Sequence, residues 1–313
     1  MAIARVAGHP DYTAAGTSKF IPEIWSGKLL VKYYDATVLA AISNTDYEGE
    51  IKNAGDKVYI RTIGDVTVND YAKGQKLTYE RIESPDVELT IDKGKYWAIT
   101  CDDVDVKQMD IAWMGKWSSE ASEQMKKKTD IDVLTGIISD GDIATENYGA
   151  TAGVKSSGYN LGAAGAPAII TRTNILDYMV DCGSVLDEQN VPEDGRWMVI
   201  PNWMANLLKK SDLRDTSFQS DGGAVLRNGR IGMIDRFTLY QSNNLYSVTD
   251  GTLSVTCYYI PFGTKAAITF ASQFVKTETL RAESTFGDLV RGLQVYGYKV
   301  LKGEAIGYMY AKK

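Results

Sequence analysis

The chain has 313 residues, of which 44% are hydrophobic and 24% are charged, a balance typical of a folded protein with a sizeable core. Its net charge of −6 argues against a protein whose main task is to grip nucleic acid, because that affinity comes largely from lysine and arginine at phosphates. The three cysteines, Cys101, Cys182 and Cys257, form no C-x-x-C pair. This favours reduced thiols in a cytoplasmic setting over a disulfide framework or a zinc site.

The N-terminal part, residues 1–54, is predicted to be an extended arm followed by a short helix. Residues 1–19 are rich in glycine, alanine and threonine, and Pro22 precedes apolar residues at helical spacing. Neither a secretory signal nor a run of about 20 apolar residues is present, so no membrane segment is expected.

Residues 55–101 are predicted to form a long β-hairpin. The stretches 56–63 and 86–92 alternate between apolar and polar residues in the manner of strands. The polar connection 64–85 between them is longer than a compact domain normally uses. Its own alternation indicates an extended two-stranded loop, which is marginal in water unless it lies on another subunit. The competing interpretation is a mobile surface loop. The candidate contact residues in this segment are Tyr71, Lys73, Lys76, Tyr79 and Arg81.

The longest helical signal runs from Asp103 to Ser139 and dominates the segment 102–168. Three aspartates lie at its start, where they favour the positive end of the helix dipole. The apolar stripe includes Trp117, Met125, Leu134 and Ile138, and it steps by four rather than in coiled-coil heptads. Such a helix is a rod of roughly 50 Å. Residues 140–168, rich in small and polar residues, are predicted to be a flexible or irregular loop.

The remaining chain reads as a compact α/β domain, 169–270, followed by returning strands, 271–313. Thr171 or Thr173 is predicted to cap a first helix, and Pro201 to open a second after a buried strand at 197–200. Further strands are expected around 231–240, 253–260 and 265–270, and the end of the chain, 288–310, alternates as strands do.

This order of elements resembles the capsid fold of tailed bacteriophages, the Hong Kong 97-type fold, an α+β architecture. In that fold a spine helix belongs to a peripheral domain, a long hairpin forms the extended loop, and a compact α/β part is the axial domain. Short phrases of the sequence are also similar to such capsid proteins. They run from Phe20 to Ser26, Tyr47 to Ile51, Gly55 to Ile60, Ile91 to Tyr96 and Phe286 to Leu293, followed by Tyr296 and Gly297.

The resemblance implies a major capsid protein that forms hexamers and pentamers, which close into an icosahedral shell around double-stranded DNA. Assembly is expected in the bacterial host cytoplasm, and the product is the virion capsid. The implied partners are other copies of the chain, a separate scaffolding protein, a portal protein and, in some systems, a decoration protein. Tight or sequence-specific DNA binding is not expected from an acidic chain. Some members crosslink subunits through an extended-loop lysine, and Lys73 and Lys76 lie in the matching loop.

Three other interpretations remain. An encapsulin, the shell protein of a bacterial nanocompartment, shares the fold but encloses cargo protein. A soluble hydrolase with residues 64–85 as its lid would need a nucleophile and a base, yet His9 is the only histidine. A carbohydrate- or receptor-binding module fits the aromatic content but not the long helix. No catalytic residue, metal ligand or cofactor is predicted.

Overall fold

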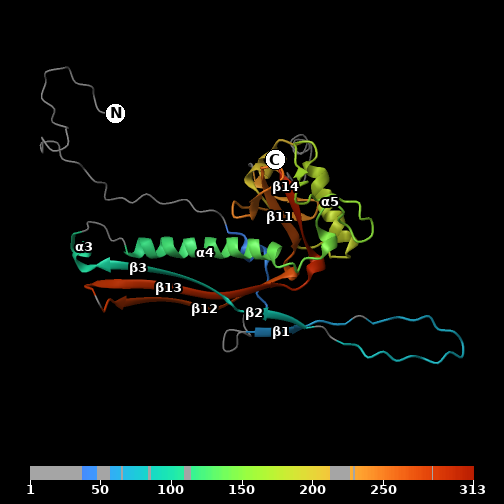
Figure 1. Ribbon diagram of the computed structural model, residues 1–313, viewed down its shortest axis with the longest axis horizontal. Coiled ribbons are helices and arrows are strands. Elements are labelled where there is room, and N and C mark those ends of the chain that lie inside the picture. Colours follow the sequence, from blue (N-terminus) through green and yellow to red (C-terminus); the bar gives the residue numbers. More distant parts are fainter. Residues whose placement is uncertain are drawn as a thin grey trace, which may run out of the picture.

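The computed structural model describes residues 37–47, 57–64, 66–83, 86–108, 114–211, 226–227, 230–283 and 285–313. The chain forms an elongated body, in which a long helix lies along a narrow sheet and a compact α/β part stands at one end (Figure 1). A thin loop leaves the body at its lower edge. The predicted N-terminal arm and the helix after Pro22 lie outside the described residues.

The helices are α1 (Leu39–Ile42), α3 (Asp103–Gln108), α4 (Met114–Ser139), α5 (Ile175–Glu188) and α6 (Asn202–Lys209), with short 3-10 turns at Thr145–Asn147, Lys265–Ala267 and Gly303–Ala305. The strands are β1 (Lys57–Arg61), β2 (Asp86–Thr90), β3 (Lys93–Asp102), β4 (Ala168–Ile169), β5 (Arg196–Ile200), β6 (Leu226–Arg227), β7 (Arg230–Ile231), β8 (Met233–Ile234), β9 (Phe237–Gln241), β10 (Ser247–Thr249), β11 (Thr256–Thr264), β12 (Ile268–Arg281), β13 (Gly287–Val300) and β14 (Ile306–Lys312).

A three-stranded antiparallel sheet in the order β12-β13-β3 forms the long part of the body. β12 and β13 are consecutive in the chain and pair over their whole length, apart from a register shift between Ser272 and Phe274. Residues 93–101, predicted as part of the extended loop, belong instead to this sheet, since β3 pairs with β13 from Lys93 to Asp102. Exposed and partly buried residues alternate along β3, as they do in an edge strand, and the prediction missed this strand.

α4 lies along one face of this sheet (Figure 1). The predicted 103–139 helix is represented by α3 and α4, while residues 109–113 between them lie outside the described part. The apolar stripe was predicted incorrectly: Trp117 is 45% exposed, and Ile138 is only partly buried. The buried positions of the C-terminal half include Asp130, Val133, Leu134 and Ile137. Among the described residues, this is the half of α4 that packs into the hydrophobic cluster of the compact part.

Polar contacts fix α4 on the sheet near Asp132. The Tyr296 hydroxyl donates to the Asp132 carboxylate at 2.7 Å, and the Lys95 ammonium lies 3.6 Å from the same group. Burial, followed by this hydrogen bond, raises the pKa of Tyr296 well above its ordinary value. Tyr296 therefore stays protonated and remains a donor to the carboxylate.

Gly136 is the point of closest approach between α4 and β13. A Cβ at this position would lie 1.5 Å from the Tyr298 hydroxyl and 2.4 Å from its ring carbon. Tyr298 is itself buried and accepts a hydrogen bond from the Lys93 ammonium at 2.9 Å. Glycine thus permits a helix–sheet contact that no larger side chain allows in this arrangement.

Gly136→Ala should destabilise the subunit by about 1–3 kcal/mol, because the Tyr298 ring must leave its packed position. Gly115→Ala on the same helix is the matched control, since a Cβ at Gly115 would meet no atom within 4 Å. It should be neutral or stabilising by up to about 1 kcal/mol through helix propensity. Urea unfolding monitored by circular dichroism measures both, and equal effects would contradict the close-packing account.

The compact part is built on a seven-stranded mixed sheet in the order β4-β14-β11-β5-β9-β8, with β10 paired to β11. β5 is buried at every position, as predicted for 197–200. The helix predicted after Thr171 begins at α5, and its N-cap is Asn174 rather than either threonine. The Asn174 side chain accepts from the Thr171 N–H and donates to the Ile169 carbonyl, so it orders the preceding turn instead of the helix end.

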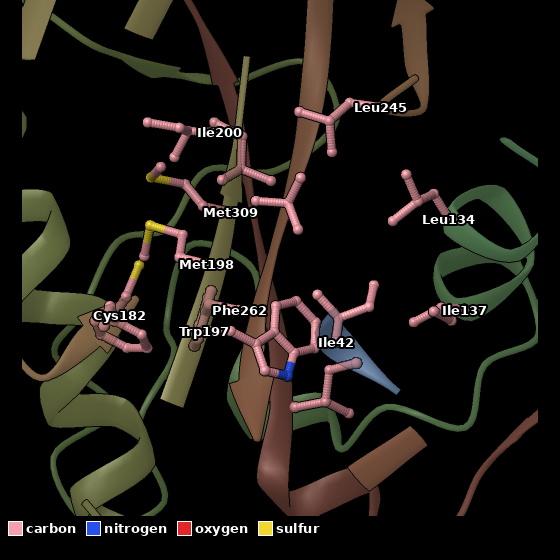
Figure 2. Packing of buried hydrophobic residues seen from close by; sticks show 14 of the residues in the cluster. Ile42, Leu134, Ile137, Cys182, Trp197, Met198, Ile200, Leu245, Phe262 and Met309 are labelled. Atoms are coloured by element: carbon pink, nitrogen blue, oxygen red, sulfur yellow. The ribbon is translucent and has the colours of Figure 1, made fainter. Parts of the chain in front are cut away.

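One hydrophobic cluster joins the compact part to the long helix. Figure 2 shows Trp197 and Phe262 of the mixed sheet on one side, and Leu134 and Ile137 of α4 on the other. Ile42 of α1 lies between them. The two parts of the body therefore share a continuous core and are held at a fixed relative position.

The segment 140–168 is irregular, as predicted, but it is packed into this core rather than free of it. Leu161 and Asn147 are fully buried. The Asn147 amide nitrogen donates to the Glu304 carbonyl at 2.7 Å and to the Ile306 carbonyl at 2.9 Å. The segment therefore braces the start of β14.

Asp130 connects three parts of the molecule from a buried position on α4. Its carboxylate accepts the backbone N–H groups of Val38 and Leu39 at 3.0 and 3.1 Å, and the side-chain amide of Asn244 at 2.8 Å. These donors belong to the start of α1 and to the loop after β9. These three hydrogen bonds replace the bonds to water that the Asp130 carboxylate loses when folding buries it.

Asp130→Ala should lower the free energy of unfolding by about 3 kcal/mol or more, because it leaves three donors without their acceptor. Asp140→Ala, at an exposed carboxylate just after the same helix, should change stability by less than about 0.5 kcal/mol. Thermal unfolding of the two variants side by side distinguishes them, and a silent Asp130 variant would be the contrary result.

Candidate intersubunit surfaces

The extended loop, residues 66–83, carries every candidate contact residue that the sequence analysis predicted. Tyr71, Lys73, Lys76, Tyr79 and Arg81 are all exposed. The loop projects from β1 and β2 and points away from the long sheet (Figure 1). The structure therefore keeps the predicted residues together on one projection and leaves their side chains accessible.

The loop is extended but is not a β-ladder. Among the described residues, antiparallel strand pairing is confined to its base, between β1 and β2. Farther out, the Thr67 backbone and hydroxyl both donate to the Glu80 carboxylate at 3.3 Å. At the tip, the Gln75 N–H closes a turn on the Ala72 carbonyl at 3.0 Å, and Gly74 supplies the left-handed φ of 89°.

Apolar residues on the loop form the contact feature that the candidate list missed. Val68 is 92% exposed, and Val66 and Leu77 are exposed as well. They accompany the predicted contact residue Tyr79, which is 90% exposed. Side chains alternate along an extended leg, so Val66 and Val68 share one side of theirs, and Leu77 and Tyr79 share one side of the other. The alternation of Val66 and Val68 was visible in the sequence. A projection that cannot bury these groups in its own core is suited to bury them elsewhere.

A second surface is the face of the long sheet turned away from α4. β1 and β2 cover only the part near Ala271 and Val295, where Gly297 lets the backbone of Thr90 approach closely. Beyond that, no other described segment covers the face, and Tyr96 is 80% exposed and Leu293 39% exposed. The open part also carries Lys276, Glu278 and Arg291, in which both cations pair with the central carboxylate.

The connection between β12 and β13 forms the far end of the body. Phe286 in this connection is 83% exposed. Beside it, Arg281 pairs with Asp103 of α3 and with Asp288 of β13. Hydrogen bonds to these two carboxylates raise the pKa of the Arg281 guanidinium. The exposed Phe286 side chain therefore lies next to a cluster of ion pairs centred on Arg281.

Two negative findings apply to the described residues. They contain no group of three histidine, cysteine or acidic side chains arranged to hold a metal ion. None of their helices combines the length and apolar character needed to cross a membrane. Cys101, Cys182 and Cys257 are free and buried.

The family model for phage capsid proteins matches residues 83–308. A solved chain from Mycobacterium phage Che8 is 28% identical, with a TM-score of 0.74 over 92% of this chain and 96% of that one. A capsid chain of Cyanophage P-SCSP1u has a TM-score of 0.68 at 15% identity, covering 94% of each chain. A chain of the bacteriophage PhiM1 mature capsid has a TM-score of 0.65 at 14% identity, covering 100% and 97%. No curated protein sequence gave a significant match.

The match covers most of the chain, and the α+β fold agrees with that of the capsid chains. The chain belongs to the phage capsid protein family. It is a structural protein of a tailed-phage virion that assembles with its own copies into the capsid shell. The Hong Kong 97-type prediction is thereby confirmed, and the encapsulin, hydrolase and binding-module interpretations are not favoured.

Proposed function

We propose that the chain forms hexamers and pentamers, in which the extended loop of each subunit lies on its neighbour, and that these close into an icosahedral shell around double-stranded DNA. The proposal rests on the exposed apolar residues of the extended loop. It exposes Val66, Val68, Leu77 and Tyr79 on a projection that has no core of its own. Contact with a neighbour would remove this apolar surface from water.

The net charge of −6 supports a shell that encloses DNA without binding it tightly, because the 40 acidic residues outnumber the 34 lysine and arginine residues that could contact phosphates. We expect a separate scaffolding protein to direct curvature, a portal protein to occupy one vertex and, in some particles, a decoration protein to bind outside. The function is structural, and we assign the chain no catalytic role and no cofactor.

Electron microscopy of the purified chain, alone and with its scaffolding protein, tests this function directly. We expect shells, or rings of five and six subunits. Monomers under every condition would contradict the proposal.

Val68→Ser on the extended loop should reduce the yield of shells strongly while leaving the folded subunit as stable as wild type. The reason is that Val68 contributes apolar surface to a neighbour and not to its own core. Sedimentation measures assembly, and thermal unfolding of the subunit measures stability. Val180→Ser on α5, where the valine is 48% exposed, makes the same change off the loop and should assemble normally. Equal assembly of the two variants would contradict the assigned role of the loop.

A further inference from the structure

We propose that Tyr310 and Asp250 form a one-electron oxidation site in the compact part, and that Tyr148, Tyr308 and Tyr259 carry electrons from Tyr310 to an oxidant at the surface. The substrate class is small one-electron oxidants, such as oxidising radicals and photo-excited dyes. The inference goes beyond shell building, and all of the residues belong to one subunit.

Five tyrosine rings form one connected network on a face of the mixed sheet. β11 and β14 are antiparallel neighbours, and Tyr259 of β11 lies opposite Tyr310 of β14. Tyr308 lies two residues before Tyr310, so alternation along the strand puts both rings on the same face. The Tyr259 ring centroid lies 4.8 Å from that of Tyr310 and 5.4 Å from that of Tyr308. Tyr259 is therefore the ring through which the network is connected.

Two further rings extend the network toward solvent. Tyr148, in the irregular segment after α4, stacks on Tyr308 with ring centroids 4.6 Å apart, and Tyr246 stacks on Tyr259 at 5.0 Å. These are the separations of aromatic rings in direct contact. The four outer rings are partly exposed, whereas Tyr310 is only 3% exposed. An oxidant that cannot enter the core can therefore take an electron from an outer ring, and ring contacts lead from there to Tyr310.

Tyr310 is the ring at which the oxidation ends, because its proton has an acceptor. A phenol that loses an electron becomes a much stronger acid than any carboxylic acid, and it releases its hydroxyl proton. The Tyr310 hydroxyl donates to the Asp250 carboxylate at 3.1 Å, and both residues are buried. Of the five rings, Tyr310 is the one for which the described residues provide a carboxylate acceptor. The proton can therefore leave Tyr310 without water.

Asp250 is held in place as that acceptor. Its carboxylate also accepts the backbone N–H groups of Gly165, Thr252 and Leu253 at 2.7, 2.9 and 3.2 Å. The Gly165 hydrogen bond is the largest cause that holds the pKa of Asp250 below its usual value, so the carboxylate is ionised before the reaction. Burial raises the pKa of Tyr310 above its usual value, so the phenol keeps its proton until it is oxidised.

The reaction moves one electron and one proton. The oxidant takes an electron from the outer ring of Tyr148, and an electron from Tyr310 replaces it through Tyr259 and Tyr308. The Tyr310 O–H bond breaks, and the proton forms a new O–H bond on Asp250. The products are the reduced oxidant, a neutral Tyr310 phenoxyl radical and a neutral Asp250 carboxylic acid. A small thiol or enediol reductant reverses the step, because it gives up one electron to the rings and the proton returns to Tyr310.

The burial of Tyr310 gives the site its use. Tyrosyl radicals at a protein surface couple with those of other chains into covalent crosslinks. A radical at Tyr310 is enclosed and cannot meet a second one. The network therefore holds the oxidising equivalent until a reductant arrives, and it spares the surfaces through which subunits contact one another.

Tyr296 provides an internal comparison. Its hydroxyl also donates to a carboxylate, that of Asp132 at 2.7 Å, and Tyr296 is fully buried. Among the described ring contacts, its partner is Phe270 at 5.7 Å, and a phenylalanine ring is much harder to oxidise than a phenol. This pair has the proton acceptor without the tyrosine network, so it should stay reduced.

Photo-oxidation tests the site, with ruthenium tris-bipyridine as the sensitiser and persulfate as the electron acceptor. The full chain is illuminated, frozen after increasing times and measured by electron paramagnetic resonance. The wild type should show a neutral tyrosyl radical that outlives the radicals of exposed tyrosines. Tyr310→Phe should abolish this long-lived signal. Tyr259→Phe should lower it several-fold, although Tyr310 and Asp250 remain in place.

Two variants serve as matched controls, and each also removes only one hydroxyl. Tyr258→Phe changes the next residue of β11, whose ring contacts Trp203 and not the network. Tyr296→Phe removes the comparison pair. Both should leave the long-lived signal unchanged, and circular dichroism checks that all four variants are folded.

Each other outcome overturns a stated part of the proposal. A long-lived signal of equal yield in Tyr310→Phe and wild type overturns the site, and so does a signal lost in Tyr296→Phe. Loss in Tyr310→Phe with no change in Tyr259→Phe overturns the route through the rings, as does an equal loss in Tyr258→Phe. A thiyl radical at Cys257, the buried thiol beside Tyr310, in place of the tyrosyl radical overturns the site as well.

Discussion

The contact between the C-terminal half of α4 and its surroundings is the constraint on which the body depends. Here a helix touches the long sheet through Gly136, the mixed-sheet core through Leu134 and Ile137, and α1 through Asp130. Each contact uses a different means: the absence of a side chain, apolar packing and a buried carboxylate. Because all three lie within about two turns of one helix, the long part and the compact part cannot shift independently without breaking several of them. A rigid body is what a shell needs from each of its units.

The extended loop, in contrast to the body, is not held in place by packing within the subunit. It has no core, and in its described part the legs are joined by the turn at Ala72 and Gln75 and by contacts such as that between Thr67 and Glu80. An isolated two-stranded ribbon is marginal in water, so the free energy that orders this loop has to come from outside the subunit. The subunit therefore combines a rigid body with a loop that its own core does not support. This combination fits a capsid protein, the family to which the chain belongs, because its subunits contact one another in a shell.

The coarse architecture was predictable because periodicity and turn residues specify local structure. The buried strand β5, the helix α5 and the polar connection between β1 and β2 all followed from pattern. What failed depended on tertiary context. Trp117 looks like a core residue, but the described residues leave it 45% exposed, and Gly136 gives no hint that Tyr298 fills its place. β3 was missed because its charged and aromatic residues resemble a loop, although its alternating exposure is that of an edge strand. The apolar loop residues were passed over in favour of aromatic and charged neighbours.

β3 bonds to β13 on one side, and no other described strand pairs with its outer side, which has a consequence for the chain before assembly. A long strand edge to which no other described strand is bonded can act as a template for an extended polypeptide, including unfolded chains in a crowded cytoplasm. Newly made subunits can therefore either assemble into shells or aggregate irreversibly. Which process dominates depends on the rate of synthesis relative to the rate at which subunits enter shells. Yield from recombinant production should accordingly be limited by this edge more than by the stability of the fold.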